Sequence, residues 1–112
     1  MTSLGPIPTF EVAVERREKT LVATPAGELD LATAPQLLAA LRAHDDYERL
    51  VIDLRSLSFM DSSGLRLLVS ERDRAVAGGY ELRLVRGGAE IGRLLRLTRL
   101  DEKLPFVEAE EV

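Results

Sequence analysis

Two neighbouring serines, Ser62 and Ser63, carry hydroxyl groups that could take part in a reaction. They lie between an acid, Asp61, and a glycine, Gly64. Hydroxyl groups in such a place either help to cap a helix or supply a nucleophile that a general base activates. The base would have to be His44, the single histidine, and the Gly-x-Ser-x-Gly pattern of a nucleophile elbow is absent. Helix capping by Asp61 is therefore the simplest interpretation of these residue types.

The remaining composition excludes most kinds of catalytic or metal site. The chain has no cysteine, which excludes a disulfide framework, a thiolate zinc site, an iron–sulfur cluster and a cysteine nucleophile. One histidine cannot form a multi-histidine metal site, and no glycine-rich phosphate-binding pattern is present. We therefore expect no enzyme activity, no catalytic residue, no bound metal and no cofactor.

Charge and hydropathy indicate that the partner is a protein. The chain has 15 Lys+Arg against 19 Asp+Glu, a formal net charge of −4, and its arginines are interleaved with acids, so we expect no nucleic-acid binding. No apolar run approaches the ~20 residues that cross a bilayer, so we expect no membrane contact. Residues 1–8 lack the pattern of a signal peptide and are expected to form a flexible tail, which favours a cytoplasmic location.

Apolar periodicity predicts a single α/β domain. The expected elements are strands at 10–15 and 20–24, a helix at 34–41, a strand at 50–54, a loop at 55–61, a helix at 62–77, a strand at 80–85, a helix at 89–97 and a strand at 104–107. A short connection makes the first two strands an antiparallel hairpin, whereas the later strands follow helices and should run parallel. We expect a mixed, mainly parallel sheet with helices packed against it, and a functional site at 57–64, beyond a strand's carboxyl end.

A helical wheel predicts which side chains are accessible near the start of the helix at 62–77. At about 100° per residue, one apolar stripe contains Leu65, Leu68, Val69, Ala75 and Val76. Ser63 and Leu67 fall on the opposite side, whereas Ser62 lies close to the buried edge. The wheel therefore predicts that Ser63 is the accessible hydroxyl and that Leu67 is an exposed apolar contact beside it.

The segment 57–65, with its Asp-Ser-Ser-Gly quartet, resembles the signature of the STAS family. It is most similar to that of the bacterial anti-sigma-factor antagonists, which carry this quartet at the corresponding helix start. The segments Gly27 to Asp30 and Leu94 to Thr98 also resemble family positions. The resemblance covers nearly the whole chain, and we expect a STAS domain over residues 9–112.

The resemblance implies a phosphorylation switch. In the family, a serine-kinase anti-sigma factor phosphorylates the second serine of the quartet, which is Ser63 here, with Ser62 as the second choice. The unphosphorylated chain would bind that kinase and free a sigma factor in a partner-switching pathway. Phosphorylation would abolish binding, and a phosphatase acting on phospho-Ser63 would restore it. The expected partner-binding residues are Asp30, Asp61, Ser62, Ser63, Gly64 and Leu67.

A second function remains open within the same family. The chain could be a STAS subunit that docks in a lipid-transport or stress-signalling assembly without phosphoswitching. Transfer of phosphate from a kinase would occur only in the first case. Residues 108–112 are interpreted as the beginning of a further helix that many family members carry, or as a disordered tail.

Overall fold

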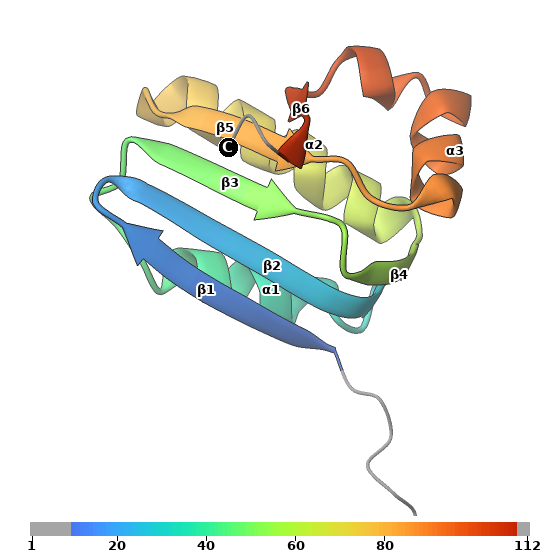
Figure 1. Cartoon of the computed structure of the whole chain (residues 1–112), viewed down its shortest axis with the longest axis horizontal. Helices are drawn as coiled ribbons and strands as arrows, with labels where there is room; N and C mark the ends of the chain where they lie inside the picture. The colour runs from blue at the N-terminus through green and yellow to red at the C-terminus, as the bar shows by residue number, and fades with distance from the viewer. Residues whose placement is uncertain (1–9, 110–112) are drawn as a thin grey trace, which may run out of the picture.

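A mixed six-stranded sheet organises the computed structural model, which describes residues 10–109 (Figure 1). The predicted tail at 1–8 and the end of the chain at 110–112 lie outside the described residues. The elements in chain order are β1 (Glu11–Arg17), β2 (Thr20–Leu29), α1 (Ala34–Arg42), β3 (Arg49–Asp53), β4 (Leu57–Met60), α2 (Ser62–Gly78), β5 (Glu81–Val85), α3 (Ala89–Leu97), a 3₁₀ turn at Leu100–Glu102 and β6 (Phe106–Val107).

The strand order is β1-β2-β3-β5-β6, and β4 pairs with the end of β2. Among the described strands, only β1 and β2 pair antiparallel, around a two-residue connection, and the other pairings are parallel. The α/β fold class, the hairpin and the mainly parallel sheet are thereby confirmed. The third helix has the predicted bounds, and α2 is one residue longer than expected.

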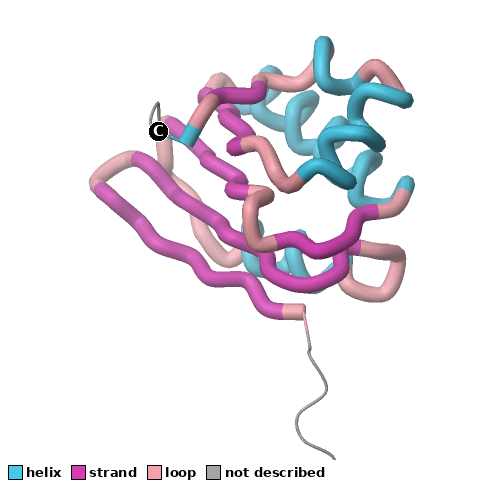
Figure 2. The backbone as a smooth tube through the Cα atoms, turned by 45° about the vertical axis from the view of Figure 1, so that its right-hand side comes forward, coloured by secondary structure: helices cyan, strands magenta, loops and turns pink. Residues whose placement is uncertain are grey.

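Helices α1 and α2 lie behind the sheet in the view of Figure 1, and Figure 2 shows the strands and these helices as two layers. The core lies between the layers. Its largest fully buried apolar side chains are Leu21, Leu29, Leu37, Leu41, Leu50, Ile52, Leu54, Leu68, Leu84 and Leu95. The remaining helix, α3, packs beside β4 at the end of the sheet where α2 begins (Figure 1).

The prediction of a loop at 55–61 is wrong for residues 57–60, which form β4. This strand pairs with the last residues of β2, where a register shift occurs between Gly27 and Glu28. Gly27 has a φ of 108°, which side-chain-bearing residues rarely adopt. The strand thus depends on a bulged partner far away in the sequence. The last strand is also shorter than predicted, at Phe106–Val107.

The wheel prediction for the second helix is wrong in its orientation. The buried positions of α2 are Gly64, Leu65, Leu67, Leu68, Glu71 and Ala75. Leu67, expected to be exposed, is only 5% exposed, whereas Val76, expected in the buried stripe, is 78% exposed. The buried face is therefore rotated by roughly 70° from the predicted one. The reason is that Gly64 and Glu71, which the apolar pattern does not count, both face the core.

A buried ion pair joins the two helices behind the sheet. Glu71 of α2 is completely buried, and both of its carboxylate oxygens accept hydrogen bonds from Arg42 at the end of α1, at 3.1 and 2.5 Å. Next to this pair, the rings of Tyr47 and Tyr80 meet edge to face with centroids 5.1 Å apart. Burial, more than any other cause, raises the pKa of Tyr80 to about 12.

Within residues 10–109, none of the helices combines the length and the apolarity that a bilayer crossing requires.

Candidate functional site

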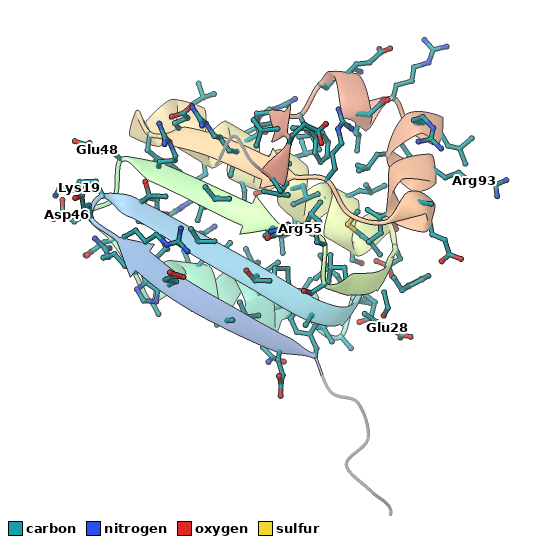
Figure 3. The ribbon with its side chains drawn as sticks, viewed as in Figure 1. Lys19, Glu28, Asp46, Glu48, Arg55 and Arg93 are labelled. Atoms are coloured by element: carbon teal, nitrogen blue, oxygen red, sulfur yellow. The ribbon has the colours of Figure 1, made fainter. Side chains whose placement is uncertain are left out.

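The candidate site lies where β2 and β4 end side by side. These strands are parallel, with Leu29 opposite Met60, so the residues that follow them, Asp30 and Asp61, start two neighbouring connections. The N–H of Asp61 donates to the carbonyl of Leu29 at 3.2 Å, which ties the two connections together. Figure 3 shows Glu28, labelled near the end of β2, at this end of the sheet.

Asp61 caps α2, as its residue type predicted. Its carboxylate oxygen Oδ1 accepts hydrogen bonds from the N–H groups of Ser63, at 2.8 Å, and Gly64, at 3.4 Å. Its backbone is extended, with φ −110° and ψ −167°, and its carbonyl accepts from the N–H of Leu65. Asp61 therefore holds the first turn of α2 in a defined position.

Asp30 likewise accepts hydrogen bonds from backbone N–H groups, at the entry to α1. Its Oδ1 accepts from the N–H groups of Ala32 at 2.9 Å and Thr33 at 3.0 Å. The hydroxyl of Thr33 donates to the carbonyl of Glu28 at 2.7 Å, which fastens the same turn to β2. Each of the two connections is thus shaped by one aspartate that binds nearby backbone N–H groups.

Gly64 lets α2 approach the sheet closely. A Cβ atom at this position would lie 2.4 Å from Cγ of Met60 and 3.1 Å from Cδ2 of Leu29. Real side chains do not tolerate a contact of 2.4 Å, so any larger residue must displace Met60. The glycine of the quartet is therefore required by packing and not by an unusual backbone angle.

The two serines have accessibilities opposite to those that the wheel predicted. Ser62 is exposed, whereas Ser63 is half-buried. The cause is the rotation of α2 described above, which brings Gly64 and Leu67 into the core and turns Ser62 outward. Accessibility therefore no longer distinguishes Ser63 as the more reactive hydroxyl.

Three exposed apolar side chains lie on the elements around the serines, and we call them the apolar rim. They are Leu31 in the β2–α1 connection, Phe59 in β4 and Leu97 in α3, with 77%, 45% and 72% of their surface exposed. A groove of about 300 Å³ lies between β4 and α3 and is lined by Phe59, Met60, Glu90, Ile91, Arg93, Leu94 and Leu97. Arg93, on α3, is labelled in Figure 3.

The apolar rim was not predicted as a site from the sequence. Leu97 is part of the segment that resembles a family position, and it lies on α3 outside the buried positions Ile91 and Leu95. That spacing could have identified Leu97 as an outward side chain, because it departs from the 3.6-residue period. For Leu31 and Phe59 no regular pattern exists, since a loop and a four-residue strand hold them.

The site does not combine its serines with a histidine. His44 follows the last turn of α1, near Asp46, which Figure 3 shows at the opposite end of the sheet from Glu28. Among residues 10–109, no group of three or more His, Cys, Asp or Glu side chains could hold a metal ion. The geometry brings together a capped backbone turn, two hydroxyls and exposed apolar side chains at one end of the sheet.

Comparison with known proteins decides the family. A sequence model described as the STAS domain matches residues 11–111. The chain belongs to the STAS domain family. This STAS domain is 33% identical over 88 residues to the anti-sigma-B factor antagonist of Staphylococcus aureus strain NCTC 8325 / PS 47, a match that covers 77% of this chain and 82% of the relative.

Solved structures agree with this assignment. An anti-sigma factor antagonist from Mycobacterium paratuberculosis is 31% identical to this STAS domain, with a TM-score of 0.78 over 88% of this chain and 85% of that one. The phosphorylated form of SpoIIAA, a Bacillus cell fate determinant, has the same fold at 22% identity, with a TM-score of 0.66 over 92% and 95% of the two chains.

Five of the six predicted partner-binding residues lie at the end of the sheet where β2 and β4 finish. They are Asp30, Asp61, Ser62, Ser63 and Gly64. Ser62 is the exposed member of the quartet, Ser63 and the two aspartates are half-buried, and Gly64 is buried. Leu67 is the exception, because its burial in the core removes it from any surface that a partner could contact.

Proposed function

We propose that this STAS domain is an anti-sigma-factor antagonist in a bacterial partner-switching pathway. The unphosphorylated form binds a serine-kinase anti-sigma factor and thereby frees a sigma factor, and phosphorylation of Ser63 abolishes that binding. The observation that carries the proposal is the capped Asp61–Gly64 turn beside the apolar rim. The relatives from Staphylococcus aureus and Mycobacterium paratuberculosis, both anti-sigma-factor antagonists, support the same function.

The assignment of Ser63 over Ser62 is supported by the position of Ser63 in the quartet. The solved structure of SpoIIAA in a phosphorylated form supports phosphorylation as a means of regulation in this fold. Half-burial of Ser63 has a mechanistic consequence, because the kinase must contact the surrounding turn closely to reach the hydroxyl. Binding and phosphorylation would therefore use the same surface.

The phosphate would change the surface and leave the fold intact. It would add a charge of about −1.5 to −2 at the N-terminus of α2, where the helix dipole favours anions. Asp61 already accepts hydrogen bonds from the N–H groups of Ser63 and Gly64, so the phosphate cannot take over that cap without displacing a carboxylate. The phosphate therefore remains at the surface, where its charge and bulk disturb the fit to the partner.

The apolar rim would supply the contact area for the kinase. Leu31, Phe59 and Leu97 come from three different elements and are among the most exposed large apolar side chains of the described residues. Exposed apolar side chains grouped around a polar turn are typical of protein contact sites. Leu31, Phe59 and Leu97 therefore replace Leu67 in the proposed partner-binding surface, beside Asp30, Asp61, Ser62, Ser63 and Gly64.

The protein would act by binding alone, in the cytoplasm. The kinase supplies the catalysis, a phosphatase resets the switch, and this STAS domain is the substrate of both. No nucleic acid or membrane takes part in the proposed mechanism. The second candidate function is docking in a larger assembly without phosphoswitching. An experiment must distinguish it from the phosphorylation switch.

Phosphorylation mapping tests the proposal. The serine-kinase anti-sigma factors of the source organism are incubated one by one with the chain, ATP and Mg²⁺, and the modified residue is located by fragmentation mass spectrometry. We expect phosphate on Ser63 in the wild type and in Ser62→Ala, and none in Ser63→Ala. Phosphate mainly on Ser62 would contradict the site, and stable binding without phosphate transfer would favour the second function.

A further inference from the structure

The strand β1 forms an edge of the sheet whose outer side has no described partner. Within residues 10–109 it pairs only with β2, from Glu11 opposite Ala26 to Arg17 opposite Thr20 (Figure 1). Residues that flank a two-residue hairpin connection exchange both of their backbone hydrogen bonds, and the bonding then alternates along the strand. The N–H and C=O groups of Val12, Val14 and Arg16 therefore point away from β2.

The side chains of β1 are charged in an order that suits pairing with itself. On the exposed face, Glu11 lies at one end of the strand and Arg17 at the other, with Ala13 and Glu15 between them. Arg17 donates to Glu15 of its own strand at 2.7 and 3.1 Å, so Glu11 of a second copy would be its additional acidic neighbour. If two copies pair antiparallel about Val14, Glu11 of each copy faces Arg17 of the other. Opposite charges directly across a strand pair stabilise the pairing.

The two registers next to this one, centred on Ala13 and on Glu15, lack this complementarity. Pairing centred on Ala13 puts Glu11 opposite Glu15, and pairing centred on Glu15 puts that glutamate opposite its own copy. Like charges directly opposite each other destabilise a strand pair. Charges on edge strands commonly prevent pairing, but here they disfavour these neighbouring registers and favour the one centred on Val14.

The helix beneath this edge leaves room for a second copy. Gln36 of α1 donates from Nε2 to the carbonyl of Phe10 at 3.0 Å, so this flank of α1 lies next to β1. The exposed residues that follow Gln36 on the same side of the helix, Ala39 and Ala43, are small. Two α1 helices can thus approach each other when the sheets join.

We propose that β1 is a dimerisation edge, at which two copies of this chain pair antiparallel about Val14 to form one continuous sheet. The occupant is a second copy because the charge order of β1 is complementary to itself in that register. The surface does not include the serines or the apolar rim, so the inference is independent of the proposed function.

Analytical ultracentrifugation of the full chain, at concentrations up to about 500 μM, tests the proposal through a charge exchange. We expect a concentration-dependent dimer for the wild type. Arg17→Glu and Glu11→Arg should each raise the dimer dissociation constant by about tenfold or more, because each creates two like-charge contacts across the two-fold axis. The double variant Glu11→Arg/Arg17→Glu should return to within about threefold of the wild type. Arg93→Glu and Glu102→Arg, exposed charge reversals elsewhere, should leave dimerisation unchanged.

Hydrogen exchange gives a second readout that reports on the backbone. The amides of Val12 and Val14 should exchange more slowly as the protein concentration rises, and the single variants should remove this dependence. A monomer at all concentrations would overturn the proposal. A dimer that is insensitive to both charge reversals, or one that the double variant does not restore, would overturn the register on which the proposal depends.

Discussion

The buried ion pair between Arg42 and Glu71 allows a quantitative prediction about the helix that carries the serines. Glu71 is completely buried, whereas the side chain of Arg42 is 34% exposed. Arg42→Met would leave a charged carboxylate in the core without its partner. Loss of one partner from a buried pair costs about 3–5 kcal/mol, a large part of the roughly 5–15 kcal/mol by which domains are stable.

The reverse substitution should cost less. In Glu71→Leu the remaining Arg42 can turn its guanidinium toward water, because it already reaches the surface. In the double variant Arg42→Met/Glu71→Leu neither charge is buried, and apolar replacements of a buried pair are often neutral or stabilising. The expected order of stability places Arg42→Met lowest, Glu71→Leu above it, and the double variant close to the wild type.

Urea unfolding followed by circular dichroism measures these differences. With a slope of about 2 kcal/mol/M, a loss of about 4 kcal/mol lowers the midpoint by about 2 M. The double-mutant cycle should show strong coupling between the two positions. If Glu71→Leu loses as much stability as Arg42→Met, or if the double variant is the least stable, the reasoning from unequal burial is refuted.

Three further predictions concern the site and its support. Gly64→Ala should lose about 1–3 kcal/mol through the clash with Met60, of which about 1 kcal/mol returns as helix propensity. Met60→Ala is itself destabilising because Met60 is buried, but calorimetry should show that Gly64→Ala costs less in a Met60→Ala background than in the wild type. Asp61→Ala should lower the free energy of unfolding by about 1 kcal/mol through loss of the helix cap, measured by urea unfolding. The hydrogen bond from Arg55 lowers the pKa of Asp53, so the stability that the charged Asp53 contributes is present at neutral pH and lost in acid. Asp53→Asn should therefore be less stable than the wild type at pH 7. The urea midpoints of the variant and the wild type should converge as the pH falls below about 4.

Features that depend on neighbouring residues in the sequence were predictable. The amphipathic pattern of α3 defined both of its ends, and the residue type of Asp61 indicated the helix cap that the structure contains. Each of these features is stabilised within a few residues of the chain, by backbone hydrogen bonds or by one apolar face. The order of strands and helices also predicted the end of the sheet at which the candidate site lies, beyond the carboxyl end of a strand.

Features that depend on distant partners were not predictable. The strand β4 forms because the bulged end of β2 is available to it, and nothing within its own four residues indicates this. The orientation of α2 was wrong because Glu71 is polar in the sequence, yet Arg42 neutralises it in the core. The exposures of Ser62, Ser63 and Leu67 were predicted from that orientation and were therefore wrong together.

Phosphorylation of Ser63 is proposed to change a partner surface without unfolding the domain. Isothermal titration calorimetry of a serine-kinase anti-sigma factor against the unmodified and the Ser63-phosphorylated chain, with thermal unfolding of both forms, tests it most directly. We expect phosphorylation to weaken binding by about tenfold or more, while the melting temperature changes little. Equal affinity of the two forms, or a large fall in melting temperature on phosphorylation, would contradict it.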